Sequence, residues 1–272
     1  MMKNKFVRIA VLMGIHILFT YLMFFPFGWK KHIESNNLYE WATFGIIGSV
    51  IPIILTLIFY KVVDKKSIKE MGFRFNVKDL LFSLSMFILM TSAALGYMFY
   101  LSNKGVISAN WNFDVFSEPS FYIQLILVGF GWFFAAFNEE ILFRGYLVSN
   151  LRSFSKGKLY VVISIVFMVS HVFKGLNPIY ALVLMVMSLV FVYAYLKSGS
   201  IMPITFAHMT WNILSPHLIG KSDISILLIE GQERTLDMFV LLATFLGLLI
   251  ILTNLFYRKD TGIVINKTIE VK

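Results

Sequence analysis

The stretch FNEEILFRGYL at residues 137–147 places three ionisable side chains, Glu139, Glu140 and Arg144, inside an apolar run that begins at Phe121. Moving a charge into hydrocarbon costs about 2.5–3.5 kcal/mol on insertion scales, so such groups indicate function or a specific pairing. In an α-helix, Glu140 and Arg144 lie four residues apart on one face, with the acid first, which is the favourable order. Glu139 is rotated by about 100° from Glu140. We therefore expect Arg144 to neutralise Glu140 and Glu139 to remain available for chemistry.

The composition around this stretch is that of an integral membrane protein. Of the 272 residues, 58% are hydrophobic and only 14% are charged, against roughly 25% charged in soluble domains, and the mean hydropathy is +0.77. The chain has no cysteine, which excludes disulfides, thiolate zinc sites and a cysteine nucleophile. The net charge of +9 comes from basic residues that flank apolar runs instead of forming a stripe, so we expect no nucleic-acid partner.

The apolar runs predict an all-α fold, a polytopic transmembrane bundle of about eight helices. About 20 apolar residues are needed to cross the hydrocarbon of a lipid bilayer. On this basis we expect helices, two of them short, at residues 6–28, 38–62, 79–101, 119–150, 159–173, 178–196, 200–218 and 236–257.

Lysine and arginine positions predict the orientation of this bundle in the cell membrane. With the N-terminus in the cytoplasm, about three quarters of the 24 basic residues fall on the cytoplasmic side. The positive-inside rule therefore predicts that both termini are cytoplasmic. Residues 67–75 mix basic and apolar side chains, and we expect them to lie along the inner membrane surface.

Two further polar pairs occur at helical spacing inside apolar segments: Phe167 with His171, and His208 with Asn212. At about 1.5 Å per residue, Glu139, His171 and His208 all lie roughly 16–20 Å from the cytoplasmic ends of their helices. We therefore expect groups from three separate helices to meet at one depth.

A carboxylate with two imidazoles supports two hydrolytic mechanisms. In the first, Glu139 is a general base toward water, and imidazole or amide donors stabilise a tetrahedral oxyanion. In the second, Glu139, His171 and His208 hold a divalent metal such as zinc, which activates the water. The sequence lacks the pattern H-E-x-x-H, and Asn212 is a better hydrogen-bond donor than zinc ligand. Both observations favour the mechanism without a metal.

Taken together, the three clusters resemble the CAAX-protease and bacteriocin-processing family of intramembrane proteases, also called the Abi family. The family pattern is two adjacent glutamates with an arginine four residues after the second, then F-x-x-x-H, then H-x-x-x-N. This chain reads EEILFR at 139–144, FMVSH at 167–171 and HMTWN at 208–212, in that order and on separate helices. The resemblance covers roughly residues 119–218, the expected catalytic core of a single integral membrane domain at 1–272.

The resemblance implies an endopeptidase, embedded in the lipid bilayer, that acts near the C-terminus of a peptide or membrane-protein substrate. It implies that Glu139 activates water with His171, and that His208 and Asn212 stabilise the oxyanion. Many members of the family are described as metalloproteases. Eukaryotic relatives trim prenylated CAAX proteins, and bacterial members are linked to peptide pheromone or bacteriocin maturation and to self-immunity.

Some of the candidate residues can also be explained by a purely structural role. Glu140 and Arg144 are equally well explained as a buried ion pair that fixes helix register, and Phe167 as a packing residue that shapes the pocket. We interpret His16, alone on the first helix, and His217, near the outer end of the seventh, as non-catalytic.

Two other classes of function stay open on the sequence. One is a non-catalytic bacteriocin immunity or peptide-binding membrane protein that keeps the fold. The other is a transporter, because ionisable groups in mid-membrane also mark ion paths. No inverted repeat is evident in the sequence, which disfavours the transporter.

Overall fold

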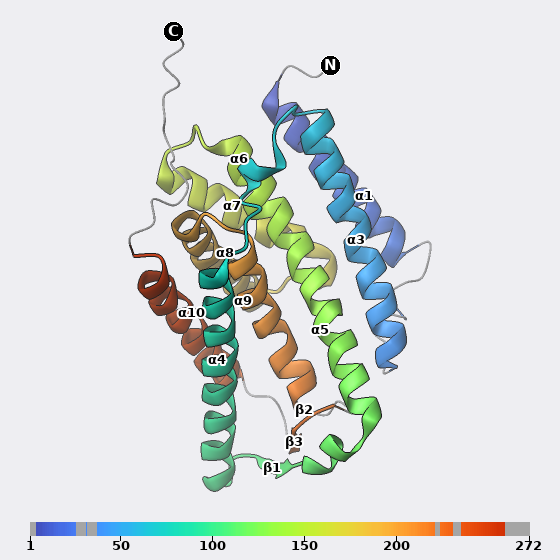
Figure 1. The fold of residues 1–272 in the computed structure, drawn as a ribbon, viewed down its shortest axis with the longest axis vertical. Coiled ribbons are helices and arrows are strands. Elements are labelled where there is room, and N and C mark those ends of the chain that lie inside the picture. Colours follow the sequence, from blue (N-terminus) through green and yellow to red (C-terminus); the bar gives the residue numbers. More distant parts are fainter. Residues whose placement is uncertain (1–3, 26–30, 32–36, 221–223, 231–234, 259–272) are drawn as a thin grey trace.

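The structure is a computed structural model that describes residues 4–25, 31, 37–220, 224–230 and 235–258. These residues form a bundle of long helices (Figure 1). The principal helices are α1 (Lys5–Phe24), α3 (Leu38–Val62), α4 (Val77–Asn103), α5 (Pro119–Glu140), α7 (Lys156–Ser170), α8 (Pro178–Ser198), α9 (Met202–Ile213) and α10 (Thr235–Phe256). The predicted all-α bundle of eight helices is therefore confirmed.

Six of the helical segments are long and apolar enough to cross a membrane, which supports a multi-pass membrane protein. One of them is continuous from Pro119 to Leu151. It comprises α5, the π-helical segment η3 (Ile141–Leu147) and α6 (Val148–Leu151). The two short helices that the sequence predicts are α7 and α9, with 15 and 12 residues. Another π-helical segment, η5 (Leu214–Leu218), extends α9.

Asparagine side chains begin several of these helices. The Oδ1 atoms of Asn4, Asn37, Asn76 and Asn177 accept backbone N–H groups from the first turns of α1, α3, α4 and α8. Such caps satisfy N–H groups that have no partner within the helix. Local sequence therefore fixes where these membrane helices start.

A small three-stranded sheet joins two connections at one end of the bundle (Figure 1). Strand β1 (Ser108–Trp111) pairs antiparallel with β3 (Leu227–Glu230), and β2 (Ile219–Gly220) pairs parallel with β3 on its other side. The sheet links the connection between α4 and α5 to the one that follows α9. The sequence analysis did not predict these strands.

Residues 67–75, expected along the inner membrane surface, dock on the turn between α8 and α9. Their short helix η1 (Ile68–Met71) ends at a buried methionine. The Tyr195 hydroxyl donates to the Met71 carbonyl at 3.0 Å, and the Ile201 N–H donates to the Gly72 carbonyl at 3.1 Å. Gly72 has a φ of +79°, and a Cβ there would lie 3.0 Å from the Gly199 carbonyl oxygen. This close approach explains the glycine.

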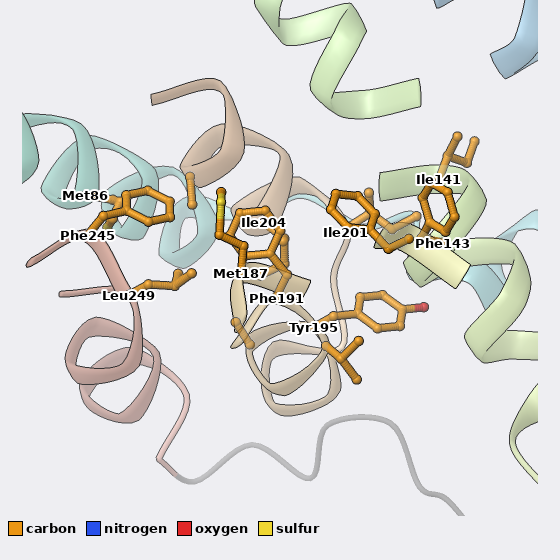
Figure 2. Close-up of a cluster of buried hydrophobic side chains, with 14 of the residues drawn as sticks. Met86, Ile141, Phe143, Met187, Phe191, Tyr195, Ile201, Ile204, Phe245 and Leu249 are labelled. Carbon is orange, nitrogen blue, oxygen red and sulfur yellow. The ribbon is translucent and has the colours of Figure 1, made fainter. Parts of the chain in front are cut away.

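Helix α8 runs through the middle of the core. Half of the apolar stretch of α8 is buried inside the protein, whereas the corresponding share is 11–33% for the other five membrane-crossing segments among the described residues. Figure 2 shows Met187 and Phe191 of α8 between Phe245 of α10 on one side and Ile201 on the other, with Phe143 of η3 beyond. Segments distant in the sequence therefore meet around α8.

Two shorter elements complete the described chain. The 3-10 helix η2 (Phe113–Ser117) leads into α5. The 3-10 helix η4 (Val172–Lys174) follows α7.

Candidate active site

The adjacent glutamates at the end of α5 lie in different environments. Glu140 is fully buried, whereas the side chain of Glu139 is 21% exposed. Nη1 of Arg144, also fully buried, donates to Glu140 Oε1 at 3.1 Å. The predicted ion pair four residues apart is therefore confirmed, and Glu139 is the more accessible of the two acids.

The segment that carries Arg144 is not the α-helix that the sequence predicts. From Ile141 to Leu147 it is π-helical, and all seven residues are buried. Gly145 allows close packing here, because a Cβ would lie 3.0 Å from side-chain atoms of both Met71 and Ile201. Short π-helical turns occur frequently at functional sites. This one widens the helix directly after Glu140.

His171 lies just past the last residue of α7, as its C-cap. Its Nδ1 is 2.9 Å from the carbonyl oxygen of Phe167. A carbonyl oxygen can only accept, so Nδ1 carries a hydrogen, and in the neutral ring Nε2 is then the acceptor. Nε2 lies 3.6 Å from Oε2 of Glu139. The acceptor side of His171 therefore faces the accessible glutamate.

His208, on α9, contacts both glutamates. Its Nδ1 lies 2.9 Å from Glu140 Oε1, and its Nε2 lies 3.9 Å from Glu139 Oε2. Because Glu140 Oε1 already accepts from Arg144, we assign Nδ1 of His208 as the donor to the same oxygen. Glu140 thus orients His208; the resemblance implies a structural or orienting role for Glu140, but the sequence did not show which side chain it orients.

Glu139, His171 and His208 come together from three helical segments, as the depth argument predicts. The separations of 3.6 and 3.9 Å exceed the 2.7–3.2 Å typical of direct hydrogen bonds. Polar contacts of this length are commonly bridged by water. One water oxygen at about 2.8 Å from the glutamate and an imidazole would satisfy both.

The remaining candidates take different positions. Asn212 follows His208 by one turn of α9 and is half-buried. No hydrogen bond joins it to the other candidate residues, all of which the structure describes.

His16 pairs with Thr56 at 2.9 Å, and the ring of His217 packs on Trp41, with centroids 5.1 Å apart. Both histidines therefore have local environments separate from the Glu139 cluster.

The guanidinium of Arg144 lies close to two aromatic rings. Only one of them, Phe167, belongs to a sequence motif. The Cζ of Arg144 lies 4.6 Å from the ring centroid of Phe167 and 5.2 Å from that of Phe191. Its Nη2 donates to the hydroxyl of Ser188 at 3.0 Å. Phe167 therefore packs in the site as expected, whereas Ser188 and Phe191 of α8 were missed. The only feature of the sequence that points to these two residues is a serine within the apolar run of α8, three residues before a phenylalanine.

The comparison with protein families agrees with this arrangement. Residues 120–214 match the family model described as type II CAAX prenyl endopeptidase Rce1-like. The match contains the α5 glutamates, His171, His208 and Asn212, and covers about a third of the chain.

Over these residues the chain is similar to the CAAX protease family. No curated protein and no solved structure matches it significantly. This similarity supports an intramembrane endopeptidase of the CAAX type in general terms. It also implies a peptide or protein substrate and association with the membrane.

The candidate metal ligands in this CAAX protease relative are Glu139, His171 and His208. One carboxylate oxygen with two imidazole nitrogens is chemically suited to Zn²⁺, which binds such atoms at about 2.0–2.2 Å. Across the described ranges, however, no group of three His, Cys, Asp or Glu side chains is arranged to hold a metal ion.

Proposed function

We propose that this chain hydrolyses a peptide bond by activating water with Glu139 and His171, while His208 and Asn212 stabilise the oxyanion. The observation that carries this proposal is the orientation of two imidazoles. Each ring is held by an acceptor at Nδ1, and each presents Nε2 to the same carboxylate oxygen of Glu139. General base catalysis requires such preset geometry around the attacking water.

The proposed reaction begins with a water bridged between Glu139 Oε2 and His171 Nε2. The water oxygen forms a bond to the carbonyl carbon as Glu139 takes a proton, and the carbonyl electron pair moves to oxygen. Collapse of the tetrahedral intermediate then breaks the C–N bond, and Glu139 returns the proton to the leaving amine. The net reaction adds one water and gives a carboxylic acid and an amine.

The oxyanion requires hydrogen-bond donors. Asn212 supplies amide N–H groups, because its side chain follows His208 by one turn on the same face of α9. His208 already donates through Nδ1 to Glu140, so it donates through Nε2 as well only when the ring carries both hydrogens. Donors of this kind typically contribute about 10²–10³-fold in rate.

The proposed substrate is a peptide or membrane-associated protein that is cut near its C-terminus. The family description, a CAAX prenyl endopeptidase, supports this class. The position of Glu139 within a membrane-crossing helix supports a scissile bond that reaches into the bilayer.

Replacing Glu139 with Gln tests the proposal. We expect E139Q to lower cleavage by about 100-fold or more, the lower range for a general base, with no loss of protein from the membrane. Peptides and membrane proteins that accumulate uncut in E139Q cells, measured by mass spectrometry, identify the substrate. The matched control is E118Q, an exposed glutamate at the other end of α5. An unchanged peptide profile in E139Q cells would contradict the proposal and favour a non-catalytic binding or immunity protein.

The same assay tests the proposed independence from metal. We expect cleavage by the purified protein to persist in 1,10-phenanthroline and to need no added zinc. Stoichiometric metal in the active protein, with activity that is lost on its removal and restored on its return, would establish the metal mechanism instead.

A further inference from the structure

Helix α8 carries none of the three motifs, yet it lies at the centre of the site. It is the most buried of the six membrane-crossing segments. Ser188, Phe191 and Tyr195 of α8 are all fully buried. Figure 2 places Phe191 beside Ile204 of α9, the helix that carries His208.

Ser188 is one end of a continuous chain of hydrogen bonds. Its hydroxyl accepts from Arg144 Nη2 at 3.0 Å, and Arg144 Nη1 donates to Glu140 Oε1 at 3.1 Å. The same oxygen accepts from His208 Nδ1 at 2.9 Å. Ser188 therefore connects to the imidazole through two charged groups. Hydrogen bonds to charged groups are stronger than neutral ones and depend on geometry.

Phe191 contacts two members of the same chain of hydrogen bonds, Arg144 and His208. Its ring centroid lies 5.2 Å from Arg144 Cζ and 5.2 Å from the ring centroid of His208. The ring centroid of Phe167 also lies 4.6 Å from Arg144 Cζ. A buried cation near two aromatic rings is stabilised by their negative faces. Phe191 therefore limits the positions of Arg144 and His208 at once.

We propose that Ser188 and Phe191 of α8 are positioning residues that hold Arg144 and Glu140 so that His208 presents Nε2 to Glu139. Their effect on the reaction rests on the proposed function, but their effect on His208 does not. Without the Ser188 hydroxyl, Arg144 loses one of its two side-chain partners and can shift along Glu140. The hydrogen bond between His208 Nδ1 and Glu140 then changes, although neither Ser188 nor Phe191 touches the attacking water.

Nuclear magnetic resonance of the full-length protein in detergent, labelled with ¹⁵N-histidine, measures this effect without any substrate. The chain has five histidines, and the H208Q variant identifies the His208 signals by their loss. We expect S188A to shift the Nδ1 and Nε2 resonances of His208, and S188T, which keeps the hydroxyl, to restore them. The matched control is S164A, because Ser164 is equally buried and its hydroxyl has no hydrogen-bond partner within the described residues.

Phe191 is tested in the same way. F191L removes the ring from between Arg144 and His208 and should shift the His208 signals. F82L is the control, because Phe82 is also fully buried but packs against Phe256 and Tyr257. Unchanged His208 signals in both S188A and F191L would overturn the proposal.

Kinetics then test whether positioning matters to the reaction. Small misplacements of catalytic groups can cost large factors in rate, so we expect S188A to lower kcat by about tenfold or more, with KM little changed. S188T should recover most of the loss. A shifted His208 spectrum with unchanged kcat would refute the role in catalysis. If E139Q leaves cleavage intact, the proposed function fails, and the spectra still decide whether α8 positions His208.

Discussion

Two neighbouring glutamates have separate roles because burial separates them. Glu140 is fully buried and serves Arg144 and His208. Glu139 is partly exposed and faces two imidazoles. Burying a carboxylate is costly unless opposite charge and hydrogen bonds compensate it. Glu140 therefore stabilises the arrangement of the site, and Glu139 is the acid that can meet a substrate.

This difference predicts unequal losses of stability. E140Q leaves the buried Arg144 without its bonded anion, and breaking a buried pair from one side typically costs about 3 kcal/mol or more. E139Q should cost much less, since Glu139 is partly exposed. Thermal unfolding of the purified variants in detergent measures both. Equal losses of stability in E139Q and E140Q would contradict the division of roles.

Packing between helices α3 and α5 depends on a single glycine. At Gly131 of α5, a Cβ would lie 2.7 Å from a ring carbon of Trp41, at the start of α3. Two residues earlier, a Cβ added to Gly129 would have no neighbouring atom within 4 Å. The absence of a side chain at Gly131 therefore lets the tryptophan lie directly on the α5 backbone.

The two glycines give a matched pair of substitutions. G129A should be neutral or stabilise the protein by up to about 1 kcal/mol, because alanine favours helix over glycine. G131A should destabilise it by about 1–3 kcal/mol, the usual cost of overpacking. Thermal unfolding in one detergent compares them. A G131A variant as stable as G129A would show that Trp41 moves aside freely.

Across the whole molecule, contacts between remote segments bring the start of α1 and the end of α10 to one end of the bundle (Figure 1). Lys5 at the start of α1 donates to Ser153 at 2.7 Å. The Tyr257 hydroxyl, just past α10, donates to Asp79 at the start of α4 at 2.7 Å. The start of α1 and the end of α10 therefore share a side of the membrane with residue 153. The three-stranded sheet marks the opposite end.

Cysteine labelling tests the predicted orientation directly, because the chain has no native cysteine. We expect K104C, after α4, to react with a membrane-impermeant maleimide in intact cells. K156C, before α7, and R258C, after α10, should react only after permeabilisation. All three residues are exposed. The reverse labelling pattern would contradict the positive-inside prediction and place the termini outside.

The sequence alone determined the helices and the meeting of the motifs. Helix existence follows from the length of apolar runs, and the contact between Glu140 and Arg144 follows from four-residue spacing within one helix. The common depth of Glu139, His171 and His208 follows from a constant rise per residue. These are local or additive properties, so they can be read from the order of the residues.

Tertiary structure alone decided how the site is held. The bond between His208 and Glu140 joins residues 68 positions apart, and that between Arg144 and Ser188 joins residues 44 apart. The sheet beyond α9 likewise forms among segments that are remote in sequence. Such contacts depend on how whole helices pack, and an apolar helix such as α8 has no periodic pattern that tells which of its residues will face a buried arginine.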